Sequence, residues 1–363
     1  MKFSRLSRRA TLTGLASTAA LPTLAASADL QRVAADIRAA VGAPGVTVAT
    51  GQGDDIRLSH AGHLRVGSET PVGNGHLWHV GSITKSMTAT LAARLVAAGK
   101  LRLFDTVAQH LTGIIPFDAG YGDVTLRALL DHRSGLPANI DLDTARSLVG
   151  TLDSRPDIRA DRVAYLTNAA AQAPDLQIDY SNAGYVMAGL ICETVTGETW
   201  EALMQAHVFD PLGLTSAGFG APGLTAPEDQ PWGHRIGLLG RHRPVAPGPE
   251  ADNVPALGPA GTVHLSATDL IRYLDAHSRR DADFLPPQFW EALHEPVTGA
   301  DYACGWGVNG TIRQHNGSNT MWYAVAGFDR DSGRTAAILT NSGAYRRLSQ
   351  PGHDALMTLL QTR

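Results

Sequence analysis

The sequence predicts an α+β fold in which an antiparallel sheet is flanked by helices and interrupted by an inserted, mostly helical domain. β-Like runs occur near the beginning of the chain and again near its end, and segments of helical periodicity lie between them. Strands from both ends most simply share one sheet. We therefore expect a discontinuous sheet domain over 29–81 and 258–363, and a helical domain over 82–257.

Length and composition limit the class of protein. The 363 residues can form two core-bearing units, or one large unit with an insertion. Hydrophobic residues make up 44% and charged residues 18%, which is typical of a globular chain. The net charge of -4, without a long basic run, gives no support to a nucleic-acid partner.

Residues 1–28 read as an export signal. Ser7–Leu12 resembles a twin-arginine signal, an apolar stretch follows over Leu12–Ala25, and Ala26–Ala28 is a small-residue cleavage site. The mature chain would then begin at Asp29 and be periplasmic or secreted. The apolar stretch is too short for a stable membrane span, although an uncleaved anchor is the alternative.

The first elements after the signal have clear patterns. Asp29–Val41 carries apolar residues on one helical face and is followed by Gly42. Gly45–Thr50 and Asp55–Ser59 are rich in β-formers, and the intervening Gly51–Asp54 is typical of a hairpin turn. The sequence therefore predicts a helix followed by a β-hairpin.

The middle of the chain predicts a succession of helices, each with a start or stop signal. They are expected from Ser82 to Gly99 and over Asp105–Leu111, Leu126–His132, Asn182–Thr196 and Glu198–Val208. The stretch 216–257 is rich in glycine and proline, without periodicity, and is predicted to be a long irregular loop that shapes the pocket.

Strands return after a helix that begins at the capping sequence Ser266–Asp269. The predicted strands are Cys304–Val308, Thr311–His315, Thr320–Gly327 and Arg334–Asn341, with a tight turn at 329–333 and a closing helix over Gly352–Arg363. The two cysteines, Cys192 and Cys304, have no metal-like or redox-like spacing. The sequence leaves open whether they pair.

One short motif carries reactive chemistry. Ser82 and Lys85 lie three residues apart at the start of a helix, so that their side chains share a face. A serine hydroxyl needs a base to become a nucleophile, and a lysine serves if its pKa is depressed. The chain has only three lysines among its 30 lysine and arginine residues, and arginine cannot act as a base. The alternative is a surface lysine on an ordinary helix.

Two more motifs follow in order, Tyr180-Ser181-Asn182 before a helix and His315-Asn316-Gly317 at the end of a β-like run. With Ser82-x-x-Lys85, they resemble the serine β-lactamase and penicillin-binding-protein family. The closest branch holds class C β-lactamases, D-alanyl-D-alanine carboxypeptidases and esterases, with the β-lactamase/transpeptidase-like fold. Further matching segments are Gly81–Ser86, Leu129–Leu136, Tyr180–Tyr185, Pro211–Leu214, Ala260-Gly261 and Ser266–Leu270.

The resemblance implies acyl transfer. Ser82 would be acylated, Lys85 would accept or relay its proton, and Tyr180 would be the second acid/base group. Tyrosine acts as a base only if a neighbouring cation lowers its pKa from about 10, and Lys85 is the natural candidate. Which of Lys85 and Tyr180 is the general base stays open.

The resemblance also implies substrate-binding roles. Asn182 would bind the substrate amide and help to fix Lys85, and it could also cap its helix. The backbone N–H groups of Ser82 and Ser318 would form the oxyanion hole. A glycine at position 317 is explained if a side chain there would block a substrate that lies along the strand edge. His132, by contrast, is expected to be structural, at a helix end.

The departure from the family lies at His315, where class C β-lactamases have lysine. Histidine is mostly neutral at pH 7 and is a weaker anchor for a carboxylate. The histidine makes efficient β-lactam hydrolysis a less favoured prediction, but it does not affect the prediction of serine hydrolase chemistry. The sequence therefore predicts an exported serine hydrolase, with a D-Ala-D-Ala-type peptide as the favoured substrate. Class C-like β-lactam hydrolysis and hydrolysis of small esters or D-amino-acid amides are the alternatives.

Other classes of protein are less well supported. The close histidine pairs, His60 with His63 and His76 with His79, lack the pattern of a zinc hydrolase, so that no metal or cofactor is expected. No serine has glycine at both flanking positions of a Gly-x-Ser-x-Gly elbow. An inactive binding protein on the same fold is the non-enzyme alternative. The oligomeric state is left open.

Overall fold

The computed structural model describes residues 20–176 and 180–361. The predicted twin-arginine motif lies outside them. The first helix, α1 (Ala20–Val41), begins earlier than the expected Asp29 and continues through the predicted cleavage site. Whether the chain is cleaved there, and where the two domains divide, stay predictions.

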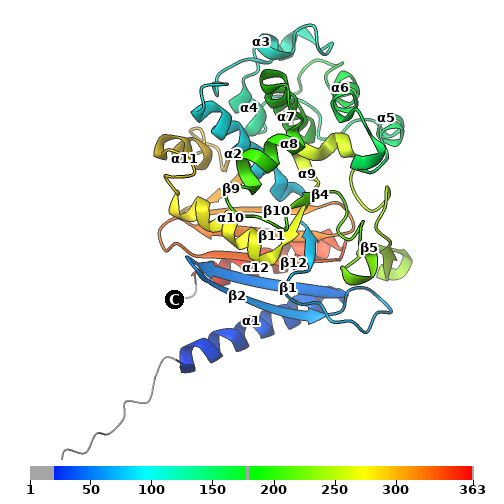
Figure 1. Ribbon diagram of the computed structural model, residues 1–363, viewed down its shortest axis with the longest axis vertical. Coiled ribbons are helices and arrows are strands. Elements are labelled where there is room, and N and C mark those ends of the chain that lie inside the picture. The colour runs from blue at the N-terminus through cyan, green and yellow to red at the C-terminus, as the bar shows by residue number, and fades with distance from the viewer. Residues whose placement is uncertain (1–19, 177–179, 362–363) are drawn as a thin grey trace, which may run out of the picture.

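One antiparallel sheet organises the described part of the chain (Figure 1). Its seven strands are β1 (Gly45–Gln52), β2 (Asp55–Gly62), β8 (Tyr302–Ala303), β9 (Trp306–Asn309), β10 (Ile312–Ser318), β11 (Tyr323–Asp329) and β12 (Thr335–Thr340). Their order is β2-β1-β12-β11-β10-β9-β8. Strands from both ends of the sequence therefore share one sheet, as the sequence predicts.

Each face of the sheet has its own core because side chains alternate along a strand. Val46 and Val48 of β1, with Ile338 of β12, pack against α1 and against α12 (Tyr345–Gln361). Alternate residues of the same strands face a larger core that includes α10 (Ala267–Arg279). Figure 1 shows α10 on one side of the sheet and α1 on the other.

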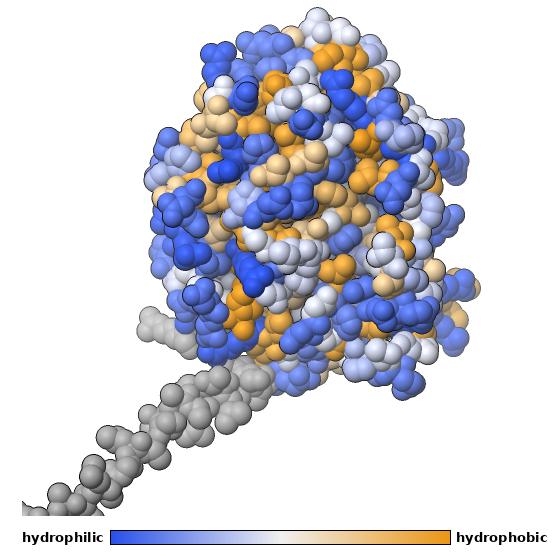
Figure 2. Space-filling model, viewed as in Figure 1, coloured by the Kyte–Doolittle hydropathy of each residue, from blue (hydrophilic) through white to orange (hydrophobic). Residues whose placement is uncertain are grey.

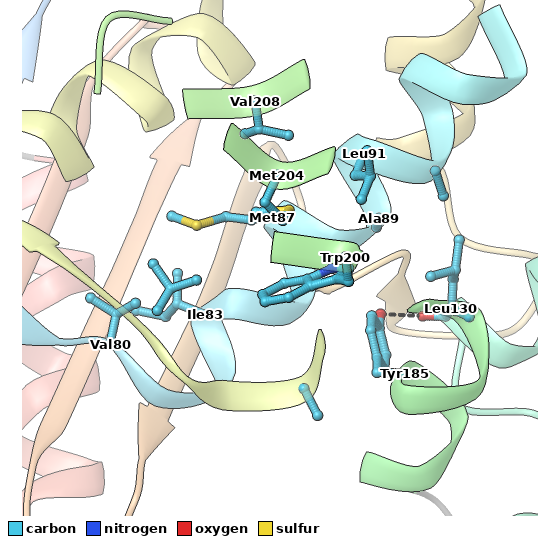
Figure 3. Close-up of a cluster of buried hydrophobic side chains, with 14 of the residues drawn as sticks. Val80, Ile83, Met87, Ala89, Leu91, Leu130, Tyr185, Trp200, Met204 and Val208 are labelled. Carbon is cyan, nitrogen blue, oxygen red and sulfur yellow. Dashed lines mark hydrogen bonds between the residues drawn. The ribbon is translucent and has the colours of Figure 1, made fainter. Parts of the chain in front are cut away.

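The larger core continues into the helical part of the molecule. Its helices are α2 (Thr84–Ala97), α3 (Val107–Leu111), α4 (Leu126–Leu130), α5 (Leu142–Ser147), α6 (Ile158–Ala169), α7 (Asn182–Thr196), α8 (Trp200–Met204), α9 (Gly258–Gly261) and α11 (Pro287–His294). Figure 3 shows Ile83, which directly precedes α2, and Met87 of α2 in a buried cluster with Trp200 and Met204 of α8. The reactive segment is therefore anchored in the core.

Several sequence predictions hold closely. The helix α7 has the expected bounds, and Thr125 and Ser266 cap α4 and α10 through their side-chain oxygens. The hairpin between β1 and β2 turns at Gly53-Asp54, since β1 extends to Gln52. The helices α5 and α11 were not predicted, because short helices leave little periodic signal, and the longer helix α6 was missed as well.

The stretch 216–257 is more ordered than the sequence predicts. It contains β4 (Gly218–Phe219) and a hairpin of β5 (Gly233–Ile236) and β6 (His242–Val245). The strand β4 joins β3 (Leu77–His79) and β7 (Val263–Ser266) in a small sheet. Two- to four-residue strands carry no recognisable alternation, which explains the error. The closing helix also begins earlier than expected, at Tyr345 instead of Gly352.

The surface is mixed in character. On the face shown in Figure 2, hydrophobic residues are scattered among hydrophilic ones over both the helical part and the sheet. Among the residues that the structure describes, no helix is both long and apolar enough to cross a membrane.

A buried ionic cluster ties the helices α6, α7 and α8 together. Arg162, which is fully buried, donates through its two terminal nitrogens to Glu193 and Glu201. Glu193 also accepts a hydrogen bond from the Trp200 backbone N–H at 2.8 Å. Removing the cation would leave two buried carboxylates without their counter-ion, which is costly in a low-dielectric interior.

We expect Arg162→Leu to lower the free energy of unfolding by about 3–5 kcal/mol, because the two carboxylates remain buried and unpaired. Urea denaturation measures the loss. As a control, Arg155→Leu removes a more exposed pair with Asp161 and should cost about 1 kcal/mol or less. Equal losses in the two variants would contradict a special role for the buried cluster.

Candidate active site

Ser82 lies at the junction between the small sheet and α2. The 3-10 turn Gly81–Ile83 precedes α2, so that Ser82 sits in this turn and not in the first α-helical turn. Ser82 is half-buried, whereas Gly81 and Ile83 on either side are buried. The serine is therefore held between buried neighbours, and its side chain is only partly accessible to solvent.

Lys85 brings three segments of the chain together. Its side chain is fully buried, and its Nζ lies 3.0 Å from Ser82 Oγ, as the Ser-x-x-Lys spacing predicts. The same nitrogen donates to Asn182 Oδ1 at 2.7 Å and to the Ala260 carbonyl at 2.7 Å. No carboxylate is among these partners, and burial lowers the pKa of Lys85 well below its usual value.

The geometry suits a neutral amine. An uncharged Nζ has two N–H groups and one lone pair. Asn182 Oδ1 and the Ala260 carbonyl, which can only accept, take the two N–H groups. The structure gives Lys85 Nζ as the donor to Ser82 Oγ at 3.0 Å; in the neutral form, the lone pair of Nζ would instead accept from the Ser82 hydroxyl over this distance. Lys85 is therefore placed to take the serine proton.

Tyr180 lies beside this pair, with Lys85 Nζ 4.8 Å from the centre of its ring. Burial raises the pKa of Tyr180 above its usual value, and a hydrogen bond with Ser82 only partly opposes this shift. The condition for Tyr180 to act as a base, a pKa lowered by a cationic Lys85, is therefore not met here. A protonated Tyr180 is suited to donate a proton, and the geometry favours Lys85 as the base.

Asn182 is the first residue of α7, and its helix cap is the neighbouring Ser181, whose side chain accepts from the Gly184 N–H at 2.9 Å. The side chain of Asn182 is thus free for the site. Its Oδ1 accepts from Lys85, and its Nδ2 donates to Asn139 Oδ1 at 2.9 Å. Asn182 therefore orients Lys85, as the resemblance implies.

The predicted oxyanion donors meet where the turn before α2 crosses the end of β10. A Cβ on Gly81 would lie 2.4 Å from the Ser318 nitrogen, and one on Gly317 would lie 2.5 Å from the Ser82 nitrogen. A Cβ on Gly317 would also lie 2.0 Å from the Val80 carbonyl oxygen. Gly317 is therefore required by this close backbone approach, and not mainly by substrate as the sequence suggested.

His315 is neutral, and both of its ring nitrogens have a polar partner. Its Nε2 lies 3.1 Å from the Tyr302 hydroxyl and its Nδ1 lies 2.5 Å from the Asn316 carbonyl. Burial, with Lys85 as a second cause, lowers the pKa of His315 to about 3. His315 therefore presents no positive charge to a substrate carboxylate at neutral pH.

The sequence analysis did not place two ring-bearing side chains, His132 and Tyr302, beside Tyr180. The ring of His132 lies 4.2 Å from that of Tyr180 and 4.7 Å from that of Tyr302, and His132 Nδ1 accepts from the Ser181 N–H at 3.1 Å. Burial lowers the pKa of His132 to about 2. His132 thus packs directly on Tyr180. Its place in the matched segment 129–136 was the available signal, whereas nothing in the sequence singled out Tyr302.

A cleft of about 580 Å³, open to solvent, adjoins these groups. The described residues that line it are Tyr180, Tyr302, Gly307, Gln314, His315, Asn316, Val325 and His353. Neither lysine nor arginine occurs among them. The register pairs β9 with only Ile312–Gln314 of β10, so that residues 315–318 pair with β11 alone. This end of β10 is therefore free to receive an extended substrate on its other edge.

The histidines and cysteines in the described part of the chain do not form a metal-binding cluster. Within residues 20–176 and 180–361, no group of three or more histidine, cysteine, aspartate or glutamate side chains is arranged around a common metal position. Cys192 and Cys304 are both buried free thiols, which answers the question that the sequence left open.

Fold and site together bring a serine hydroxyl and a buried lysine amine into contact beside the end of β10. The sequence model of the family described as Beta-lactamase matches residues 30–356, and the chain therefore belongs to this family. This confirms the family resemblance and the predicted fold. Members of the family are in general serine hydrolases.

Individual relatives agree with this placement. The chain is 30% identical to penicillin-binding protein 4 of Amycolatopsis lactamdurans, over 83% of this chain and 81% of the relative. It is 29% identical to a β-lactamase of Pseudomonas fluorescens, over 64% and 59%. Among solved structures, the octameric penicillin-binding protein homologue from Pyrococcus abyssi superposes with a TM-score of 0.74 at 25% identity, covering 92% of this chain and 77% of that one.

We expect Lys85→Arg to reduce the acylation rate of Ser82 about 10³-fold or more, because arginine cannot give up its proton. The lowered pKa of Lys85 adds a pH dependence: wild-type acylation should rise with pH and level off well below pH 10.5, once the amine is neutral. Both effects are measured as the rate of Ser82 acylation by a penicillin in a stopped-flow experiment. Lys100→Arg, at an exposed lysine, is the matched control and should behave like wild type.

Proposed function

We propose that this protein is an exported serine hydrolase that forms an acyl-serine intermediate on D-alanyl substrates, in the manner of a D-alanyl-D-alanine carboxypeptidase. The observation that carries the chemistry is Lys85, whose buried amine contacts Ser82 Oγ and two acceptor oxygens. The similarity to a penicillin-binding protein over most of both chains supports the substrate class. Export rests on the sequence of residues 1–28.

Each step has a residue suited to it. Ser82 Oγ attacks the carbonyl carbon while its proton passes to Lys85. The negative oxygen that develops is stabilised by the backbone N–H groups of Ser82 and Ser318. Tyr180 gives a proton to the departing nitrogen and is reprotonated from Lys85. Water then releases the acyl group from Ser82 by the reverse proton path.

The first test is acylation by a penicillin, followed by the intact mass of the protein. Wild type should gain the mass of the opened penicillin, and Ser82→Ala should not. A lasting adduct supports a peptidase with slow deacylation, whereas loss of penicillin without an adduct indicates a β-lactamase. If neither penicillins nor activated D-alanyl esters acylate the wild type, the proposed hydrolase activity is wrong, and a binding protein on this fold is the alternative.

A second candidate concerns the leaving group. His315 is neutral, and neither lysine nor arginine is among the described residues that line the cleft. A free terminal carboxylate would therefore lose its hydration without gaining a cationic partner. This observation favours D-amino-acid amides or small esters, whose departing end is uncharged.

Two peptides with the same scissile bond separate these candidates: N-acetyl-D-Ala-D-Ala as the free acid and as its terminal amide. If the cleft selects uncharged ends, the amide has a kcat/KM at least equal to that of the acid. His315→Lys should then shift the preference about tenfold towards the acid, since a charge-assisted hydrogen bond becomes available. A strong preference of wild type for the free acid would exclude the second candidate and support the carboxypeptidase.

A further inference from the structure

A buried carboxylate lies behind the catalytic residues. Asp252, in the stretch between β6 and α9, has a side chain that is 7% exposed. Its Oδ1 lies 2.6 Å from His79 Nε2 and accepts from Asn319 Nδ2 at 3.2 Å and from the Asn253 N–H at 2.6 Å. Burying a carboxylate is costly, and here only Oδ1 accepts hydrogen bonds, whereas Oδ2 has no partner. Two of the neighbours of Oδ1, His79 and Asn319, belong to segments that carry the proposed oxyanion hole.

The first connection leads to Ser82. His79 is the last residue of β3, and its Nδ1 accepts a hydrogen bond from the Gly81 N–H at 3.1 Å. An imidazole that accepts at Nδ1 carries its proton on Nε2. This nitrogen lies 2.6 Å from Asp252 Oδ1, a close polar contact without the geometry of a hydrogen bond. Gly81 has a φ of +52° and directly precedes Ser82. The pair of Asp252 and His79 therefore holds the backbone that presents the Ser82 N–H.

The second connection leads to Ser318. Asn319 follows Ser318, and its side chain spans the turn between β10 and β11. Its Nδ2 donates to Asp252, and its Oδ1 accepts from the Met321 N–H at 3.2 Å and the Trp322 N–H at 3.1 Å. Thr320 within this turn has a φ of +70°, a conformation that needs external support. Through Asn319, Asp252 thus also supports the backbone that presents the Ser318 N–H.

A third contact comes from the next residue. Asn253 Nδ2 donates to the Gly261 carbonyl at 2.7 Å, and Gly261 follows Ala260, whose carbonyl oxygen accepts from Lys85. One short segment, Ala251–Asn253, therefore reaches the surroundings of the nucleophile, the second oxyanion donor and the base.

We propose that Asp252 is a positioning residue of the oxyanion hole: its one carboxylate oxygen fixes both backbone donors, through His79 on the Ser82 side and through Asn319 on the Ser318 side. This inference rests on the proposed acyl-serine chemistry. Asp252 itself does not contact the cleft that substrate would occupy. Oxyanion donors help only when they are aimed at the developing charge, so that a small displacement lowers the rate without preventing substrate binding.

The test compares three variants. Asp252→Ala removes the acceptor, whereas Asp252→Asn keeps an oxygen that can accept from the same donors. Asp275→Ala is the matched control, because Asp275 is also buried, accepts from the Gly53 N–H at 3.0 Å and pairs with Arg279, but lies on α10 away from the site. Acylation by a penicillin or an activated D-alanyl ester is measured per folded molecule, with folding checked by thermal denaturation.

We expect Asp252→Ala to slow acylation about tenfold to a hundredfold with little change in KM, part of the loss that follows removal of one oxyanion donor. Its affinity for a boronic acid that forms a tetrahedral adduct should fall by a similar factor. Asp252→Asn and Asp275→Ala should stay within a few-fold of wild type. Unchanged acylation in folded Asp252→Ala would overturn the inference, and so would an equal loss in Asp275→Ala.

Hydrogen–deuterium exchange separates this inference from the proposed function. Asp252→Ala should exchange faster than wild type in peptides covering 79–83 and 317–322, and Asp275→Ala should not. If wild type fails to acylate, the proposed function is wrong, yet faster exchange at both segments still supports the positioning role. Unchanged exchange at either segment would overturn it whatever the activity.

Discussion

The buried amine of Lys85 is the interaction on which the site depends. A lysine amine can be buried away from water at low cost only if its N–H groups find hydrogen-bond acceptors. Here the acceptor oxygens come from three segments of the chain. Ser82 belongs to the turn before α2, Asn182 to the beginning of α7, and Ala260 to α9. Because burial favours the neutral amine, the packing that places Lys85 also suits it to act as a base.

A second constraint is the close approach of two backbones. The turn that carries Ser82 crosses the end of β10 so closely that neither Gly81 nor Gly317 has room for a side chain. At this point the helical part and the sheet meet through main chain, which brings the backbone nitrogens of Ser82 and Ser318 near the crossing. Main-chain donors held in this way do not need to reorganise when charge develops, which is what an oxyanion hole requires.

The cleft differs from the catalytic core in character. The groups around Lys85 are held by short hydrogen bonds, whereas the cleft beside them is lined by polar, aromatic and apolar residues, including His315 and Tyr302, with neither lysine nor arginine among the described ones. The family fold supports several acyl-transfer reactions, so that the choice of substrate depends on this lining and not on Ser82 or Lys85. The single departure that the sequence revealed, His315 in place of lysine, lies in this lining.

The sequence by itself determined the family and the general fold, and it predicted the site residues. Ser82 and Lys85 are three residues apart, so that local helical geometry brings them together, and the Tyr180-Ser181-Asn182 motif pointed to Asn182 through the family resemblance. Only the tertiary structure decided what depends on contacts between distant segments. These are the direction of the pKa shift of Tyr180, the packing of His132, the reason for Gly317 and the position of Asp252. Local patterns record spacing along the chain, whereas burial and long-range hydrogen bonds arise only when the sheet and the helices pack together.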